Sequence, residues 1–130
     1  MGKRIKQELE FSVHSSPAIL YSYLSGASGL AEWYADEVNV KGSKLYLFRW
    51  EGDDEPREAE MVKSHPKKNI VFKWTDRLEE HEEWGFEIFQ DELTGDVTLV
   101  VTDYCEEDEE DINAEVWESQ VELLKSLIGA

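Results

Sequence analysis

Cysteine is almost absent from the sequence: Cys105 is the one thiol among 130 residues, so no disulfide can form within the chain. This is typical of proteins from a reducing compartment. The sequence also lacks any apolar run of the roughly 18 to 20 residues that a membrane-spanning helix needs. Its N-terminus continues into alternating, strand-like sequence, without the apolar segment of a secretory signal. These absences predict a cytoplasmic protein that does not insert into a membrane.

Basic residues are scarce as well, because 13 Lys and Arg face 30 Asp and Glu and leave a formal net charge of −17. A surface of this sign repels the phosphate backbone of nucleic acids and the headgroups of anionic membranes. We therefore expect no nucleic-acid partner. A well-solvated surface accounts for part of the acidity without any further role.

Motifs of enzymes and metal sites are missing too. The sequence contains no glycine-rich phosphate loop, no nucleophile elbow and no spaced set of Cys and His. His14, His65 and His81 fall at a strand end, in a turn and in an acidic loop, where surface roles are typical. The acidic runs 53–55 and 106–111 do not follow the spacing of a calcium loop. The sequence thus predicts no catalytic residue, no metal and no cofactor.

Aromatic side chains, in contrast, are plentiful, with 5 Trp, 5 Tyr and 5 Phe. Together with a hydrophobic content of 41%, they suffice for one sizeable core. We therefore expect residues 1–130 to form a single domain, and a monomer is compatible with this size.

Local patterns predict one strand and two short helices at the start of the chain. Apolar residues alternate over 4–13, as in a strand. The Ser-Ser-Pro sequence at 15–17 is typical of a helix start, because a serine side chain can cap the first turn and proline fits the first position. Gly26 is placed to end this helix, and Ser28 is placed to cap the next one.

Beyond Asp36 the hydrophobic period changes to two, which indicates an antiparallel meander. Turn residues divide it into six further strands, at 37–40, 44–50, 57–64, 69–75, 82–90 and 97–105. A final helix is predicted over 111–128, where apolar residues recur at spacings of four, three and four, namely Trp117, Val121, Leu124 and Ile128.

Alternation also assigns the two faces of the sheet. One parity carries mostly charged residues and threonine, which predicts a solvated outer face. The other parity is apolar and predicts the concave face, with Phe48, Trp50, Ala59, Met61, Ile70, Phe72, Trp74, Trp84, Phe86, Ile88, Val97, Leu99 and Val101.

The order of these elements resembles the helix-grip fold of the START-like, or SRPBCC, superfamily, which includes birch-pollen-allergen and polyketide-cyclase relatives. Trp33, Trp117 and the hairpin 59–74 with His-Pro-Lys-Lys at its turn are similar to the branch of the activator of heat-shock-protein ATPase. The resemblance implies an α+β fold, in which a curved antiparallel sheet of about seven strands wraps around the C-terminal helix. Two short helices would lie between the first two strands. Such a fold does not by itself transfer a function.

The loops of a meander alternate between the two ends of the sheet. We expect the loops 51–55 and 76–83 and the lead-in 106–111 to share one end, which would form an acidic rim. The other end would receive the basic turns 41–44 and 65–68 and the acidic turn 91–96. The resemblance to helix-grip proteins places the acidic rim around a cavity entrance. Such a rim attracts cationic ligands or a basic protein partner.

Three functions remain open. The first is non-enzymatic binding of a small hydrophobic or amphipathic ligand, such as a lipid, in a cavity between the sheet and the final helix. The lining candidates are Trp50, Met61, Phe72, Trp74, Trp84, Phe86, Trp117 and Val121. The same side chains could instead fill the space completely. The second is a co-chaperone-like interaction module that uses the acidic rim, and the third is a polyketide cyclase-like enzyme, which would need a carboxylate or histidine in the cavity.

Overall fold

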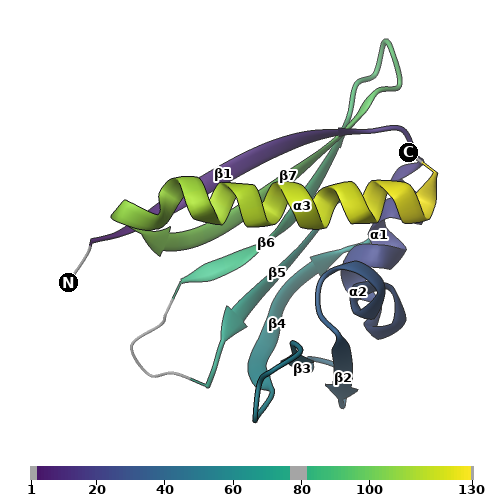
Figure 1. Cartoon of the computed structure of the whole chain (residues 1–130). Coiled ribbons are helices and arrows are strands. Elements are labelled where there is room, and N and C mark those ends of the chain that lie inside the picture. The colour runs from purple at the N-terminus through teal and green to yellow at the C-terminus, as the bar shows by residue number, and fades with distance from the viewer. Residues whose placement is uncertain (1–2, 77–81, 130) are drawn as a thin grey trace.

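The computed structural model describes residues 3–76 and 82–129, and its strands form a single antiparallel sheet (Figure 1). The seven strands lie in the order β1-β7-β6-β5-β4-β3-β2. This confirms the predicted α+β helix-grip fold with about seven strands. The elements are β1 (Arg4–Val13), α1 (Pro17–Ser25), α2 (Ala27–Trp33), β2 (Glu37–Lys41), β3 (Leu45–Arg49), β4 (Arg57–His65), β5 (Asn69–Trp74), β6 (Glu83–Gln90), β7 (Val97–Glu106), a 3-10 turn (Glu107–Glu109) and α3 (Glu110–Ile128).

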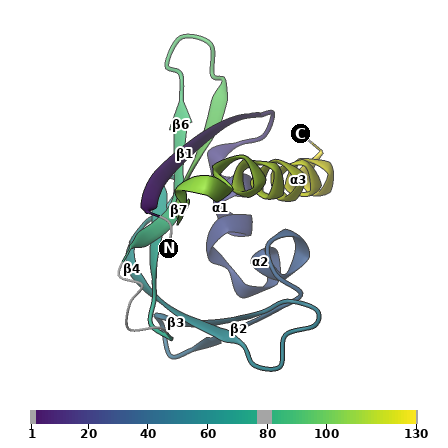
Figure 2. The same cartoon turned by 60° about the vertical axis from the view of Figure 1, so that its left-hand side comes forward.

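The sheet curves around α3, which lies across its concave side (Figures 1 and 2). The first strand pairs with the last over its full length, from the Arg4 and Glu106 pair to the Val13 and Val97 pair. The helices α1 and α2 occupy the same side of the sheet as α3, and α2 contacts both β2 and α3. In the described part of the chain, no helix combines the length and apolarity needed to cross a membrane.

The helix boundaries follow the sequence signals closely, with one difference. The Ser16 side chain accepts a hydrogen bond from the Ile19 amide at 3.2 Å, and Pro17 opens α1. Gly26 ends α1 and, in an extended conformation, also precedes the first residue of α2. The prediction that Ser28 caps α2 is therefore wrong, because the turn at Gly26 starts this helix without a side-chain cap and leaves Ser28 inside it.

The concave face carries the core, as alternation predicts. Phe48, Phe72 and Phe86 are fully buried in its middle, together with apolar residues of α1, α2 and α3. Trp50 and Trp74 are only partly buried, because they lie at the ends of β3 and β5, where the core opens. Packing is therefore complete in the middle of the sheet and incomplete at one end.

The strand order places the loops β3–β4 and β5–β6 and the start of α3 at one end of the sheet. Arg57, at the end of the β3–β4 loop, pairs with Asp76 of the β5–β6 loop. The Glu107 amide, before α3, donates to the carbonyl of Lys3, which precedes β1, at 2.7 Å. Of the expected acidic rim, residues 77–81 lie outside the described residues. The turns β2–β3, β4–β5 and β6–β7 lie at the opposite end.

Candidate ligand-binding cavity

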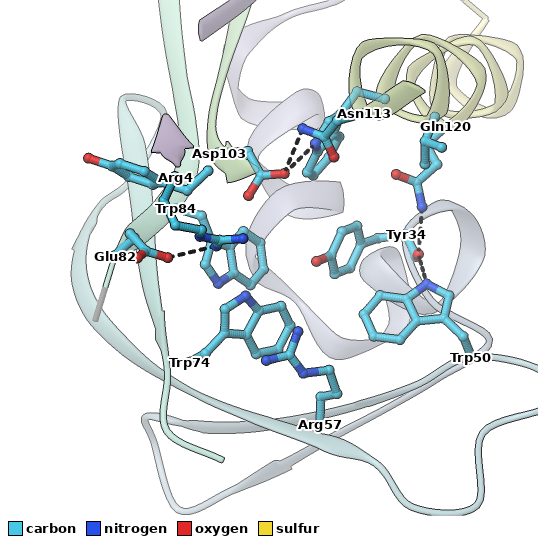
Figure 3. Close-up of a pocket in the computed structure, with 13 residues that line it drawn as sticks. Arg4, Tyr34, Trp50, Arg57, Trp74, Glu82, Trp84, Asp103, Asn113 and Gln120 are labelled. Carbon is cyan, nitrogen blue, oxygen red and sulfur yellow. Dashed lines mark hydrogen bonds and ion pairs between the residues drawn. The ribbon is translucent and has the colours of Figure 1, made fainter. Parts of the chain in front are cut away.

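A cavity of about 390 Å³ lies where the sheet, α2 and the first half of α3 meet, at the end that holds the acidic loops (Figure 3). Among the described residues, its wall combines six aromatic side chains with charged and amide side chains. The lining residues are Arg4, Tyr34, Trp50, Arg57, Trp74, Glu82, Trp84, Asp103, Tyr104, Asn113, Val116, Trp117 and Gln120.

Tyr34 joins most of the elements around the cavity. It caps the C-terminus of α2, and its ring stacks on Trp84 at 5.4 Å and on Trp117 at 5.7 Å between ring centroids. Its backbone carbonyl accepts hydrogen bonds from Trp50 Nε1 at 2.8 Å and from Gln120 Nε2 at 3.1 Å (Figure 3). One residue therefore connects α2 to β6, to α3 and to the segment after β3.

The Tyr34 phenol is held in its neutral form. Burial raises its pKa well above the ordinary value, and the Asp103 carboxylate raises the pKa further, while Arg57 acts in the opposite direction. The hydroxyl therefore keeps its proton at neutral pH and can serve as a hydrogen-bond donor or acceptor.

Asp103 is the carboxylate of β7 that faces α3. Its Oδ2 atom accepts hydrogen bonds from Trp117 Nε1 at 2.8 Å and from Asn113 Nδ2 at 3.2 Å. Asn113 Nδ2 also donates to Gln7 Oε1 at 2.7 Å, and Gln7 Nε2 donates to the Glu110 carbonyl at 3.0 Å. This chain of polar groups fixes the first turns of α3 against β1 and β7.

The two arginines of the wall each bind a carboxylate. Arg57 donates to both oxygens of Asp76, at 3.0 and 3.1 Å, and its guanidinium carbon lies 3.9 Å from the centroid of the Trp74 ring. Burial by itself would raise the pKa of Asp76, but the hydrogen bonds and charge of Arg57 lower it below the ordinary value. Arg4 binds Glu82 at 2.8 Å.

The floor of the cavity is the Trp84 indole, which stacks on Trp74 at 5.0 Å and on Phe72 at 4.7 Å between ring centroids. Trp84 Nε1 is buried and has no hydrogen-bond partner among the described residues. A buried donor left unpaired costs about 1–3 kcal/mol. Trp84 therefore carries an unpaired donor that is buried beneath the cavity surface.

The predicted lining residues divide into two groups. Trp50, Trp74, Trp84 and Trp117 line the cavity. The other four predicted residues do not line the cavity. Phe72, Phe86 and Val121 are buried in the core next to it, and Met61 is partly buried and packs against the core. Alternation distinguishes the faces of a strand, but it does not distinguish the filled middle of the sheet from its open end.

Several lining residues were not predicted, although the hydrophobic periodicity of the sequence places them on inward-facing positions. Asp103 has the parity of the inward-facing Leu99 and Val101, and Arg57 has the parity of Ala59. On α3, the polar residues Asn113 and Gln120 share the face of the buried Trp117 and Leu124. A polar residue at an inward-facing position of a strand or of α3 therefore indicated the cavity.

Of the groups typical of metal or acid-base chemistry, the carboxylates of Glu82 and Asp103 line the cavity, whereas the described histidines do not. His14 and His65 are exposed and do not line the cavity, and His81 lies outside the described residues. In residues 3–76 and 82–129, no group of three or more His, Cys, Asp or Glu side chains could hold a metal ion.

A curved sheet that grips a C-terminal helix and leaves an aromatic cavity at one end defines an α+β helix-grip protein. The model of the START-like superfamily domain matches residues 1–130, and the chain belongs to this superfamily. No curated protein matches the sequence.

Solved structures show the same fold. A Bacteroides fragilis protein is 36% identical, with a TM-score of 0.68, and the alignment covers 98% of this chain and 92% of that one. The Aha1 dimer of Colwellia psychrerythraea is 16% identical, with a TM-score of 0.77 and coverage of 95% and 96%. CalU16 of Micromonospora echinospora is 12% identical, with a TM-score of 0.68 and coverage of 98% and 74%. The last two similarities concern the fold alone.

The raised pKa of Tyr34 makes stability depend on alkaline pH. Below about pH 10 both states keep the phenolic proton, whereas above it the unfolded chain ionises and the folded protein does not. The free energy of unfolding should therefore fall as the pH rises above about 10. We expect the tyrosinate absorbance of Tyr34 to appear only when the protein unfolds, so Tyr34→Phe should remove that part of the signal. Appearance of the Tyr34 tyrosinate absorbance while the protein is still folded would contradict the burial of the phenol.

Proposed function

We propose that the protein binds a small amphipathic molecule with a flat apolar part in the cavity, without transforming it. The observation that carries this proposal is the cavity of about 390 Å³, whose described lining includes six aromatic side chains. Small-molecule sites usually measure about 300–1,000 Å³ and combine apolar walls with a few polar groups. The cavity matches this description in volume, at the lower end of the range, and its lining is more polar than that of the usual site.

The aromatic rings supply the apolar contact. Trp74 and Trp84 stack on each other, and Tyr34 stacks on Trp84, so the rings form a continuous wall. A flat ligand gains both burial and stacking on such a wall. The neighbouring polar groups, among them the Tyr34 hydroxyl and the Asp103 carboxylate, favour an amphipathic molecule over a purely hydrophobic one.

Binding is tested by melting curves and tryptophan fluorescence with a panel of lipids, flat aromatic compounds and polyketides. A ligand present at 100 times its dissociation constant stabilises the folded state by about 2.7 kcal/mol. Trp74→Leu removes part of the wall and should weaken binding about tenfold. Phe89→Leu, at a half-exposed site on the outer side of β6, is the control and should bind as the unchanged protein does. A panel that shifts neither signal would contradict the proposal.

A second function is favoured by an exposed apolar stripe along α3, formed by Ile112, Val116, Leu123 and Leu127, of which Val116 also borders the cavity. Their side chains are 62%, 50%, 47% and 41% exposed, and spacings of four, seven and four place them on one side of the helix. Such a stripe is the usual docking surface for an amphipathic helix.

The charges beside the stripe indicate the kind of partner. Glu115, Glu118 and Glu122 are exposed along α3, and Lys125 is the one basic residue of this helix. We propose a basic amphipathic helix of another protein as the occupant. The partner is basic, as in the co-chaperone-like alternative, but that alternative placed it at the acidic rim and not on α3. A second copy of the chain would bring the same carboxylates against each other.

The docking surface is tested with a labelled helical peptide of Leu and Lys and with a Leu and Glu peptide that has the same apolar face. Fluorescence anisotropy should detect the Lys peptide alone, because the carboxylates of α3 repel the other one. Leu123→Ser should weaken binding about fivefold. Leu93→Ser, at a 96% exposed site in the β6–β7 turn, should leave it unchanged. Equal binding of both peptides, or equal effects of both variants, would refute the docking surface.

A further inference from the structure

We infer that the molecule bound in the cavity carries a positively charged amine, and that Asp103 is the carboxylate that binds this amine. The inference rests on the proposed binding function and names the ligand class of the same cavity. It excludes fatty acids and other carboxylates as the principal ligands.

The first argument is the charge balance of the wall. Among residues 3–76 and 82–129, four charged side chains line the cavity. Both cations among them hold a carboxylate: Arg4 binds Glu82, and Arg57 binds Asp76. Asp103, in contrast, accepts its hydrogen bonds from two uncharged groups, the Trp117 indole and the Asn113 amide. The charge that remains to be balanced on the wall is therefore negative.

The second argument is the chemistry of the rings. Aromatic faces attract cations electrostatically, and desolvation strengthens this attraction. The wall already shows such a contact, because the Arg57 guanidinium lies 3.9 Å from the centroid of the Trp74 ring. Close to Asp103, Trp117 donates its indole N–H to the carboxylate and stacks on Tyr34, so an amine bound there would also meet aromatic surface.

The third argument is the potential at the cavity and its entrance. At the Tyr34 hydroxyl the effect of Asp103 on the pKa exceeds the opposing effect of Arg57, so the negative charge dominates inside. Outside, the loops of the same end are acidic, with exposed carboxylates at 51 and 53–55 and again at 107–111. Such a surface raises the local concentration of cations and lowers that of anions.

The test uses three naphthalene derivatives of the same shape that differ in charge: 1-naphthylmethylamine, 1-naphthylmethanol and 1-naphthoate. Isothermal titration calorimetry at low ionic strength should give the amine an affinity about tenfold above that of the alcohol, because a charge-assisted hydrogen bond is added. The carboxylate should bind weakest. Added salt should reduce the preference for the amine.

Asp103→Asn removes the charge and keeps an oxygen acceptor for the Trp117 indole, so it should lower the affinity for the amine to that for the alcohol. Asp96→Asn makes the same change of net charge at an exposed site in the opposite turn, and it should preserve the preference. Circular dichroism checks that both variants fold. If Asp103→Asn does not fold, the inference is tested by whether the unchanged protein prefers the amine to the alcohol and whether added salt reduces this preference.

The outcomes separate this inference from the proposed function. If the alcohol binds as tightly as the amine, or if Asp103→Asn folds and retains the preference, the inference is overturned and the binding function stands. If the naphthoate binds tightest, the inference is overturned in the same way. If none of the three compounds binds, both the inference and the proposed cavity function fail.

Discussion

Tyr34 follows α2 directly, and its buried ring and its carbonyl are the contacts on which the cavity depends. The ring stacks on Trp84 of β6 and Trp117 of α3, while the carbonyl accepts hydrogen bonds from Trp50 and Gln120. Together with the hydrogen bonds of Asp103 to α3, this side chain and this peptide group fix the sheet and the final helix relative to each other at this end. Since the carbonyl already has two donors, the hydroxyl is the part of Tyr34 that remains available to a ligand.

The cavity exists because the polar residues of α3 and β7 cannot pack as the apolar ones do. In the middle of the molecule, Phe48, Phe72 and Phe86 fill the space between sheet and helices. At the open end, Asp103 and Asn113 occupy equivalent inward positions and bind each other, so they hold the helix by hydrogen bonds without filling the space. The concave face therefore holds a filled core in its middle and a cavity at one end. The difference arises because the inward-facing side chains are apolar in the middle and partly polar at that end.

Periodicity predicted most of the fold, because burial on one face imposes a period of two on strands and a helical period on α3. The order of β2 to β7 follows from the same pattern, since consecutive antiparallel strands lie side by side. The pairing of β1 with β7 does not follow from it. The depth of each aromatic residue could not be predicted in this way. Phe72 and Trp74 have the same parity on β5, yet only Trp74 reaches the cavity, because it lies at the strand end. The pairing of Asp103 with Trp117 joins residues of different elements and depends on the tertiary packing.

The central claim is that a ligand enters the open end while the aromatic core stays filled. The five tryptophan indoles report on it directly in a nitrogen-proton correlation spectrum, titrated with whichever naphthalene derivative binds tightest. We predict that the indole signals of Trp50, Trp74, Trp84 and Trp117 shift on binding. The Trp33 signal should stay in place, because its N–H donates to the Tyr23 carbonyl at 2.8 Å, outside the cavity wall. A titration that shifts Trp33 as much as the other four, or that shifts none of the four, would contradict the account.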